Sequence, residues 1–215
     1  MYLNEIFPNL YHVVLPKPQL GETFMRFSEY SESPKFRGKV FTKKEFEDWY
    51  IANAQEVIDK QCTYAMDWGG FNIPARVFNV FKIGHFNPLD EKEKELLSAL
   101  QVIKNKKFHV IGTHADGDIE TIEHEIGHGF YDLDTIYQKN TRAIVREMNV
   151  RGRNSIRDLL VFFNYHPQRF VDETQAYLLH PDWLEEQGIP KRFIEAASRK
   201  VRNEFKESCI RLRKA

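Results

Sequence analysis

The sequence contains few cysteines, no long apolar run and no excess of charge of either sign. Cys62 and Cys209 are the only cysteines among 215 residues, which is too few for a disulfide framework, and they lack the C-x-x-C spacing of a structural zinc knuckle. No apolar stretch approaches the roughly 20 residues that span a bilayer, so we do not expect a membrane protein. Lysine and arginine balance aspartate and glutamate at 31 each, so bulk charge does not indicate a nucleic-acid partner.

The sequence also lacks signals for export and for a division into several domains. Its first residues, MYLNEIFPNLYHVVLPKP, contain no basic segment ahead of an apolar one, so they do not resemble a secretory signal and we expect a cytoplasmic protein. No Gly-rich linker, low-complexity tract or internal repeat is found. We therefore expect a single α+β domain over residues 1–215, with possible lobes at 1–133 and 134–215 and a cleft between them.

Hydrophobic periodicity predicts strands early in the chain and helices late. Residues 41–60 have helical spacing, and Thr42 with Glu45 three residues later matches the capping-box pattern at the start of this helix. Residues 90–104 are predicted to form a second helix. The predicted strands are 10–15, 76–83 and 107–113. The later predicted helices are 119–133, 135–148, 154–164, 169–179 and 190–212.

The C-terminal segment is basic, but its apolar residues recur at helical spacing. We expect its arginines and lysines to be the solvated face of a terminal helix rather than a nucleic-acid contact. The packed stripe beneath that face is predicted to contain Phe193, Ile194, Ala197, Val201, Phe205 and Ile210.

One motif indicates metal chemistry: His124-Glu125-Ile126-Gly127-His128. Residues four apart lie on the same face of a helix, so His124 and His128 can direct two imidazole nitrogens at one zinc ion. Glu125 stands beside the first histidine, where it can reach a metal-bound water without being a ligand, as a general base requires. Asp118 is expected to cap the helix, with a buried stripe on the face opposite the motif. The expected stripe consists of Ile119, Ile122, Ile126, Phe130 and Leu133.

A strand, a short turn and an H-E-x-x-H helix together resemble the zincin metallopeptidases over residues 107–179. The resemblance implies one zinc ion, a zinc-activated water and an extended peptide substrate bound by strand addition along an edge strand. Zincins differ in the third metal ligand. Glu173, in the predicted helix 169–179, matches the gluzincin arrangement, in which a glutamate from a later helix completes the site.

Asp134 is the alternative third ligand. It lies six residues after His128, as in the metzincin pattern H-E-x-x-H-x-x-G-x-x-H/D, but that pattern requires glycine where this chain has Tyr131. We favour Glu173. A peptide-deformylase arrangement would need an upstream cysteine ligand, and the surroundings of Cys62 (KQCTYA) do not match that family.

Groups that support the ligands and the transition state are less clearly marked. Gluzincins often place an acidic residue four after the third ligand, where this chain has Tyr177; Asp132 and Asp172 are candidates to accept a hydrogen bond from a ligating histidine instead. The candidates for stabilising the oxyanion are Tyr165, His166, Tyr177 and His180, of which we select Tyr165 and His180. His180 lies two helical turns after Glu173 if the helix extends that far, which Pro181 opposes.

These features predict a cytoplasmic zinc metallopeptidase that acts on peptide or protein substrates. His124, His128 and Glu173 are the expected metal ligands, and Glu125 is the expected general base. Two alternatives stay open: a non-catalytic zinc-binding protein that uses a zincin scaffold to recognise a partner, and a zinc amidohydrolase that acts on a non-peptide or formyl substrate.

Overall fold

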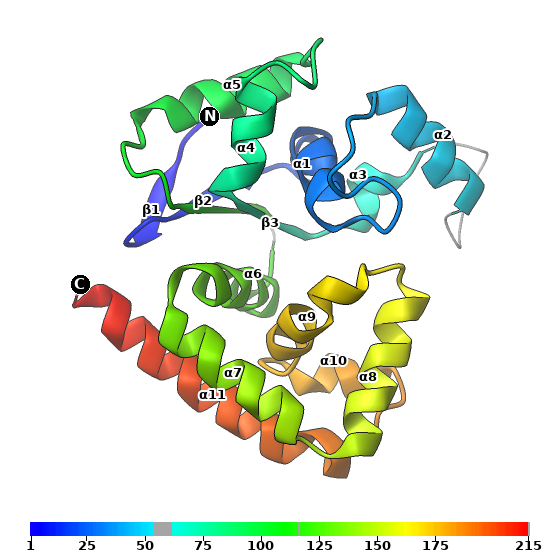
Figure 1. The fold of residues 1–215 in the computed structure, drawn as a ribbon, viewed down its shortest axis with the longest axis vertical. Coiled ribbons are helices and arrows are strands. Elements are labelled where there is room, and N and C mark those ends of the chain that lie inside the picture. The colour runs from blue at the N-terminus through cyan, green and yellow to red at the C-terminus, as the bar shows by residue number, and fades with distance from the viewer. Residues whose placement is uncertain (54–61, 116, 215) are drawn as a thin grey trace. The chain divides into compact units, whose positions relative to one another are not determined.

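The computed structural model describes residues 1–53, 62–115 and 117–214 (Figure 1). It has the α+β composition that the sequence predicts, with a small sheet and many helices. The strand order in the sheet is β1-β2-β4-β3. The strands are β1 (Asn4–Phe7), β2 (Leu10–Leu15), β3 (Gly70–Pro74) and β4 (His109–His114).

The strand β4 is buried on both faces. It pairs antiparallel with β3, from Gly70 opposite Thr113 to Pro74 opposite His109. Every residue of β4 except the last is buried, which accounts for its continuous rather than alternating apolar pattern. The predicted strands 10–15 and 107–113 thus correspond to β2 and β4.

The described residues divide into two compact units. One unit comprises residues 1–4 and 11–117, and the other comprises residues 5–10 and 118 onward. The division falls before the helix that carries the H-E-x-x-H motif, whereas the possible lobes expected from the sequence meet after that helix. The motif and the helices that follow it therefore belong to the same unit.

Helices of the first unit surround its aromatic core. The predicted capping box is present at α2, because the Thr42 amide donates to Glu45 Oε2 (2.7 Å) and the Glu45 amide donates to Thr42 Oγ1 (3.2 Å). The end of the predicted helix 41–60 lies outside the described residues. The helices are α1 (Lys17–Glu32), α2 (Lys43–Asn53), α3 (Tyr64–Asp67), α4 (Ala75–Lys82), α5 (Glu91–Ala99) and the 3₁₀ helix η1 (Leu100–Val102).

Two expectations for this unit are wrong. Residues 76–83 were expected to form a strand because they are rich in β-branched and aromatic types, but residues 75–82 form α4, whose buried Val77, Phe78 and Phe81 have helical spacing. The helix α1 was not predicted at all. It packs closely on the sheet, because a Cβ at Gly112 would lie 2.7 Å from the Phe24 ring.

The second unit is a helical array in which most boundaries agree with the sequence. The α6 helix has the predicted bounds, and Asp118 caps it by accepting from the Thr121 amide at 2.7 Å. The short helix α10 was not predicted, because the sequence indicates a helix over residues 169–179 and Pro181 was expected only to mark its end. The helices are α6 (Ile119–Leu133), α7 (Thr135–Glu147), α8 (Val150–Phe162), η2 (Pro167–Arg169), α9 (Phe170–Tyr177), α10 (Pro181–Glu186) and α11 (Lys191–Arg213).

The buried face of α6 differs from the expected apolar stripe. Phe130 is fully buried between Phe7, Tyr137 and Phe205, but Ile119 is 64% exposed. The residues that this helix buries are Glu125, Gly127, His128, Gly129 and Phe130. The helix thus buries most of its polar motif together with two glycines, which is an unfavourable arrangement unless the polar groups have partners.

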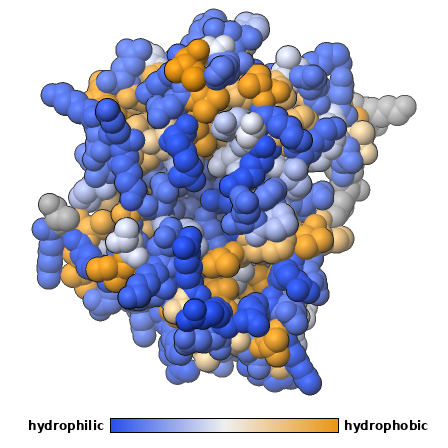
Figure 2. All heavy atoms as spheres, in the orientation of Figure 1, coloured by the Kyte–Doolittle hydropathy of each residue, from blue (hydrophilic) through white to orange (hydrophobic). Residues whose placement is uncertain are grey.

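Surface and helix composition give no sign of a membrane segment. Among the described residues, no helix is both long enough and apolar enough to cross a bilayer. The face in Figure 2 is mostly hydrophilic, with apolar residues in separate patches. The terminal helix α11 has the expected amphipathic character, since Ile194, Ala197, Val201 and Phe205 are buried. Two members of the predicted stripe differ, because Phe193 is only partly buried and Ile210 is 48% exposed.

Candidate metal centre

The helix α6 brings the two motif histidines together. His124 and His128 stand one turn apart, and their Nε2 atoms are 3.1 Å from each other. Their rings meet nearly edge to face. His128 is 1% exposed, so neither nitrogen of this ring is freely hydrated. Both Nε2 atoms therefore face a common point inside the second unit.

The helix α9 supplies a carboxylate to the same point. Glu173 Oε2 lies 3.5 Å from His128 Nε2 and 3.8 Å from His124 Nε2. The side chains of Leu179 and Gln175 approach α6 at Gly127 of the motif, where a Cβ would lie 2.9 Å from Leu179 Cδ1 and 3.6 Å from Gln175 Oε1. Two segments 45 residues apart in the chain (173 − 128 = 45) thus converge.

These three residues can hold a metal ion. Ligand atoms about 2.0–2.1 Å from a tetrahedral centre lie about 3.3 Å apart, and the three separations here are 3.1, 3.5 and 3.8 Å. Among the described residues, the only cluster of at least three His, Cys, Asp or Glu side chains with this proximity is His124, His128 and Glu173. Two imidazole nitrogens and one carboxylate oxygen leave a fourth tetrahedral position open.

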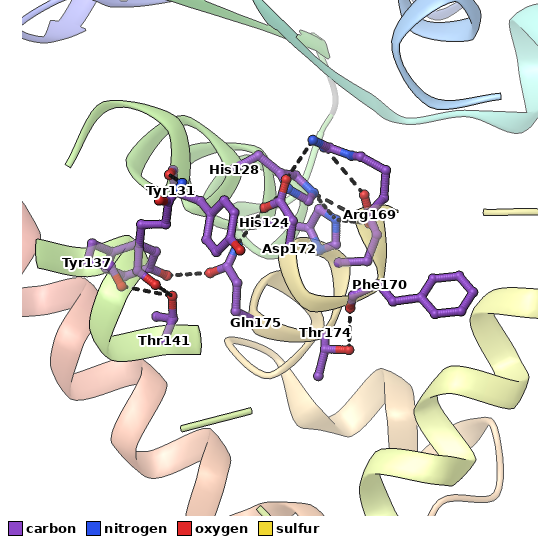
Figure 3. Close-up of polar contacts among 12 residues, drawn as sticks. His124, His128, Tyr131, Tyr137, Thr141, Arg169, Phe170, Asp172, Thr174 and Gln175 are labelled. Carbon is purple, nitrogen blue, oxygen red and sulfur yellow. Dashed lines mark hydrogen bonds and ion pairs between the residues drawn. The ribbon is translucent and has the colours of Figure 1, made fainter. Parts of the chain in front are cut away.

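Asp172 orients the His128 ring through its Nδ1 atom, while Nε2 faces the cluster. Its Oδ1 lies 2.8 Å from His128 Nδ1, so Nδ1 carries the proton in the neutral ring and Nε2 is left to bind a metal. Gln175 Nε2 donates to the same oxygen at 3.2 Å, and Gln175 Oε1 accepts from the buried Tyr137 hydroxyl at 2.6 Å. Of the two aspartates considered from the sequence, the structure places Asp172 in this position (Figure 3).

Burial and the neighbouring charges shift the pKa values of the two histidines in opposite directions. Burial, together with the nearby charge of His128, holds the pKa of His124 well below its usual range. Burial alone would lower the pKa of His128 as well, but the carboxylates of Asp172 and Glu173 raise it well above that range. Despite its burial, the pKa of Asp172 is lowered by Arg169 and His128.

Arg169 is a member of the site that sequence reasoning missed. Its Nη1 lies 2.7 Å from Asp172 Oδ2, and its Nη2 lies 3.7 Å from Glu173 Oε1. It stands three residues before Asp172 and four before Glu173, a spacing at which residues of a helix are neighbours. That spacing could have identified it once Glu173 was chosen as the third ligand.

An aromatic ring packs against His124. Tyr177 packs edge-on against it with ring centroids 4.7 Å apart. The Tyr177 hydroxyl is 3.1 Å from that of Tyr165, so two of the candidates for stabilising an oxyanion contact each other beside His124. Trp183 stacks on the Tyr177 ring at 4.4 Å.

The other predicted participants lie on the same two helices or just after them. Glu125 is 6% exposed on α6, immediately after His124. His180 does not extend α9, which ends at Tyr177; it precedes α10, and its Nε2 lies 2.9 Å from Glu123 Oε2. The expected spacing of two helical turns after Glu173 is therefore wrong, although His180 is close enough for its charge to lower the pKa of His124.

Asp134 has a structural position instead of a place among the ligands. It caps α7 by accepting from the amides of Ile136 (2.9 Å) and Tyr137 (3.1 Å). Its other oxygen accepts from Ser208 Oγ at 2.7 Å and from Arg211. The helix α6 also continues past residue 131 to Leu133 without the sharp turn of the metzincin pattern. Both observations argue against Asp134 as the third ligand.

No known protein family, curated protein or solved structure matches this chain. Its function must therefore be argued from the site alone.

Proposed function

We propose that this chain is a zinc-dependent metallopeptidase of the zincin type, with His124, His128 and Glu173 as its metal ligands. The observation that carries the proposal is the convergence of Glu173 with the two histidines of an H-E-x-x-H motif in a buried site. Imidazole nitrogens and a single carboxylate oxygen are the donors that catalytic zinc prefers, and three protein ligands leave a position for water or substrate.

A bound zinc ion would supply Lewis-acid chemistry, which lowers the pKa of water to about 7 and polarises a carbonyl group. The protein contributes the remaining functions. Glu125, adjacent to His124 and buried, accepts the proton of the attacking water and passes it to the leaving amine. A low-dielectric environment strengthens each of these charge interactions.

The supporting residues also favour a catalytic over a purely structural centre. Asp172 fixes the tautomer of His128, which is the usual partner arrangement for a ligating histidine. Structural zinc sites are normally closed by four protein ligands, whereas the cluster among the described residues has three. A base beside an open position has no use in a site that only stabilises the fold.

The proposal is tested with the wild-type chain and Glu125→Gln, a change that preserves size and removes the base. We expect both proteins to bind one zinc ion per chain, and only the wild type to cleave members of a peptide library. A wild-type protein that binds zinc but cleaves no peptide would favour the alternative of a non-catalytic zinc-binding protein. Cleavage of formyl or other non-peptide amides in place of peptides would favour an amidohydrolase.

A further inference from the structure

Arg169 contacts two carboxylates at the candidate metal centre. The side chain is 11% exposed and lies at the end of η2, directly before α9. Figure 3 shows its guanidinium near Asp172 and the two histidine rings. Its two terminal nitrogens are directed to different carboxylates, Nη1 to Asp172 and Nη2 to Glu173.

In each of these carboxylates, one oxygen faces the histidines and the other faces Arg169. Glu173 directs Oε2 to the histidines and Oε1 to Arg169. Asp172 directs Oδ1 to His128 Nδ1 and Oδ2 to Arg169. One guanidinium thus faces the outer oxygen of both carboxylates, at 2.7 Å from Asp172 Oδ2 and 3.7 Å from Glu173 Oε1. The inner oxygens face the histidines, and the inner oxygen of Asp172 also accepts from Gln175 Nε2.

We propose that Arg169 is a positioning residue that restricts Glu173 to one-oxygen coordination of the metal and, through Asp172, orients His128. This inference rests on the proposed function, because it assigns a role within the same metal centre. A carboxylate can bind a cation through one oxygen or through both. A cationic partner at Oε1 competes for that oxygen, and it thereby keeps a coordination position available to water or substrate.

The geometry requires arginine rather than any positive charge. A guanidinium presents its donors in a rigid planar fork, so it can address two carboxylates at once, whereas a lysine ammonium is a single point of charge on a flexible stem. Because both terminal nitrogens are directed at Asp172 and Glu173, Arg169 acts on the reaction through those residues.

The test compares wild type with Arg169→Lys and Arg169→Gln. Arg157→Gln is the matched control, since Arg157 is an exposed arginine that pairs with Asp158 on α8. Zinc affinity is measured by competition with a chromophoric chelator, and coordination is read from the visible absorption of the chain loaded with Co²⁺. Circular dichroism shows which variants are folded. If Arg169→Gln does not fold, the comparison is made with Arg169→Lys alone.

We expect both Arg169 variants to bind zinc about 10–100-fold more weakly, as is typical for loss of a partner of the ligands. We also expect their cobalt bands to weaken, because a second oxygen of Glu173 raises the coordination number, while the control matches wild type. Affinity within about twofold of wild type and an unchanged cobalt spectrum in folded variants would overturn the inference, as would full rescue by lysine. Failure of the wild type to bind zinc or cobalt would instead refute the metal centre itself.

Discussion

The ring of Tyr177 packs edge-on against the ring of His124, with centroids 4.7 Å apart and planes inclined by 64°. This is the position, four residues after Glu173, where the gluzincin resemblance implies an acidic residue. The two histidines are therefore held differently: His128 by the Asp172 carboxylate and His124 by aromatic packing. The ring of Trp183 in turn stacks on the ring of Tyr177.

If packing holds His124, then Tyr177→Phe should preserve metal binding and Tyr177→Ala should weaken it. We expect zinc affinity within about threefold of wild type for the phenylalanine variant, and about tenfold weaker binding for alanine, because loss of a supporting partner leaves the ligand free to rotate. Isothermal titration with zinc measures both. An alanine variant with wild-type affinity would show that the ring contact contributes nothing to the site.

The Tyr165 hydroxyl is one candidate for stabilising an oxyanion. Tyr165→Phe should lower kcat by about 100-fold, the range found when one such donor is removed, and should leave zinc content unchanged. Steady-state peptide hydrolysis gives kcat, and Tyr131→Phe is the control, because the Tyr131 hydroxyl is bonded to Arg142 Nε at 2.7 Å. Equal losses in the two variants would exclude a specific role for Tyr165.

Glu173 and Asp134 should differ sharply when each is replaced by alanine. Glu173→Ala removes one of three ligands, so we expect the purified protein to lack zinc. Asp134→Ala should retain zinc but lower the free energy of unfolding by about 2–4 kcal/mol, since Asp134 caps α7 and pairs with Arg211. Elemental analysis and urea unfolding separate the two effects, and the reverse pattern would make Asp134 the ligand.

A pH dependence of stability is expected from Glu29 in the first unit. Burial, with a smaller contribution from the neighbouring charge of Glu32, raises the pKa of Glu29 to about 7 despite hydrogen bonds to Tyr64 and Ser33. A carboxyl whose pKa is raised on folding contributes most to stability below its unfolded pKa of about 4.3, and that contribution is lost as pH rises to about 7.

Glu29→Gln should therefore be as stable as wild type at pH 4 and more stable at pH 8. The expected gain is on the order of 1–2 kcal/mol, because each unit of pKa difference is worth about 1.4 kcal/mol and the group is only partly removed from water. Chemical unfolding at the two pH values measures it. A gain of equal size at both would point to a cause other than ionisation.

The sequence predicted the helix α6 well because several local signals agree there. Asp118 is a good cap, the motif has helical spacing, and the predicted and observed bounds coincide at Ile119 and Leu133. The selection of Glu173 required a family resemblance, since no local pattern indicates which acidic residue of a helix faces a site 45 residues earlier. The helices α7, α8, α9 and α11 also have periodic apolar residues, so their existence was predicted, whereas that of the short helix α10 was not.

The failures have identifiable physical causes. The helix α1 was missed because its buried face includes Thr23, Arg26 and Ser28, which obscure the apolar periodicity. The buried stripe of α6 was wrong because the helix buries its chemically active side, and Ile119 remains exposed. The spacing of Arg169 from Asp172 and Glu173 can be read from the sequence, but the carboxylate oxygens that it contacts are defined only by the folded chain.

The most direct test of the metal centre is a crystal of the zinc-loaded chain measured above and below the zinc absorption edge. We predict one anomalous peak per chain, about 2.0–2.1 Å from His124 Nε2, His128 Nε2 and Glu173 Oε2, with Glu173 Oε1 still turned to Arg169. A peak bound by Asp134 or by a cysteine, or no peak at these three residues, would contradict this account.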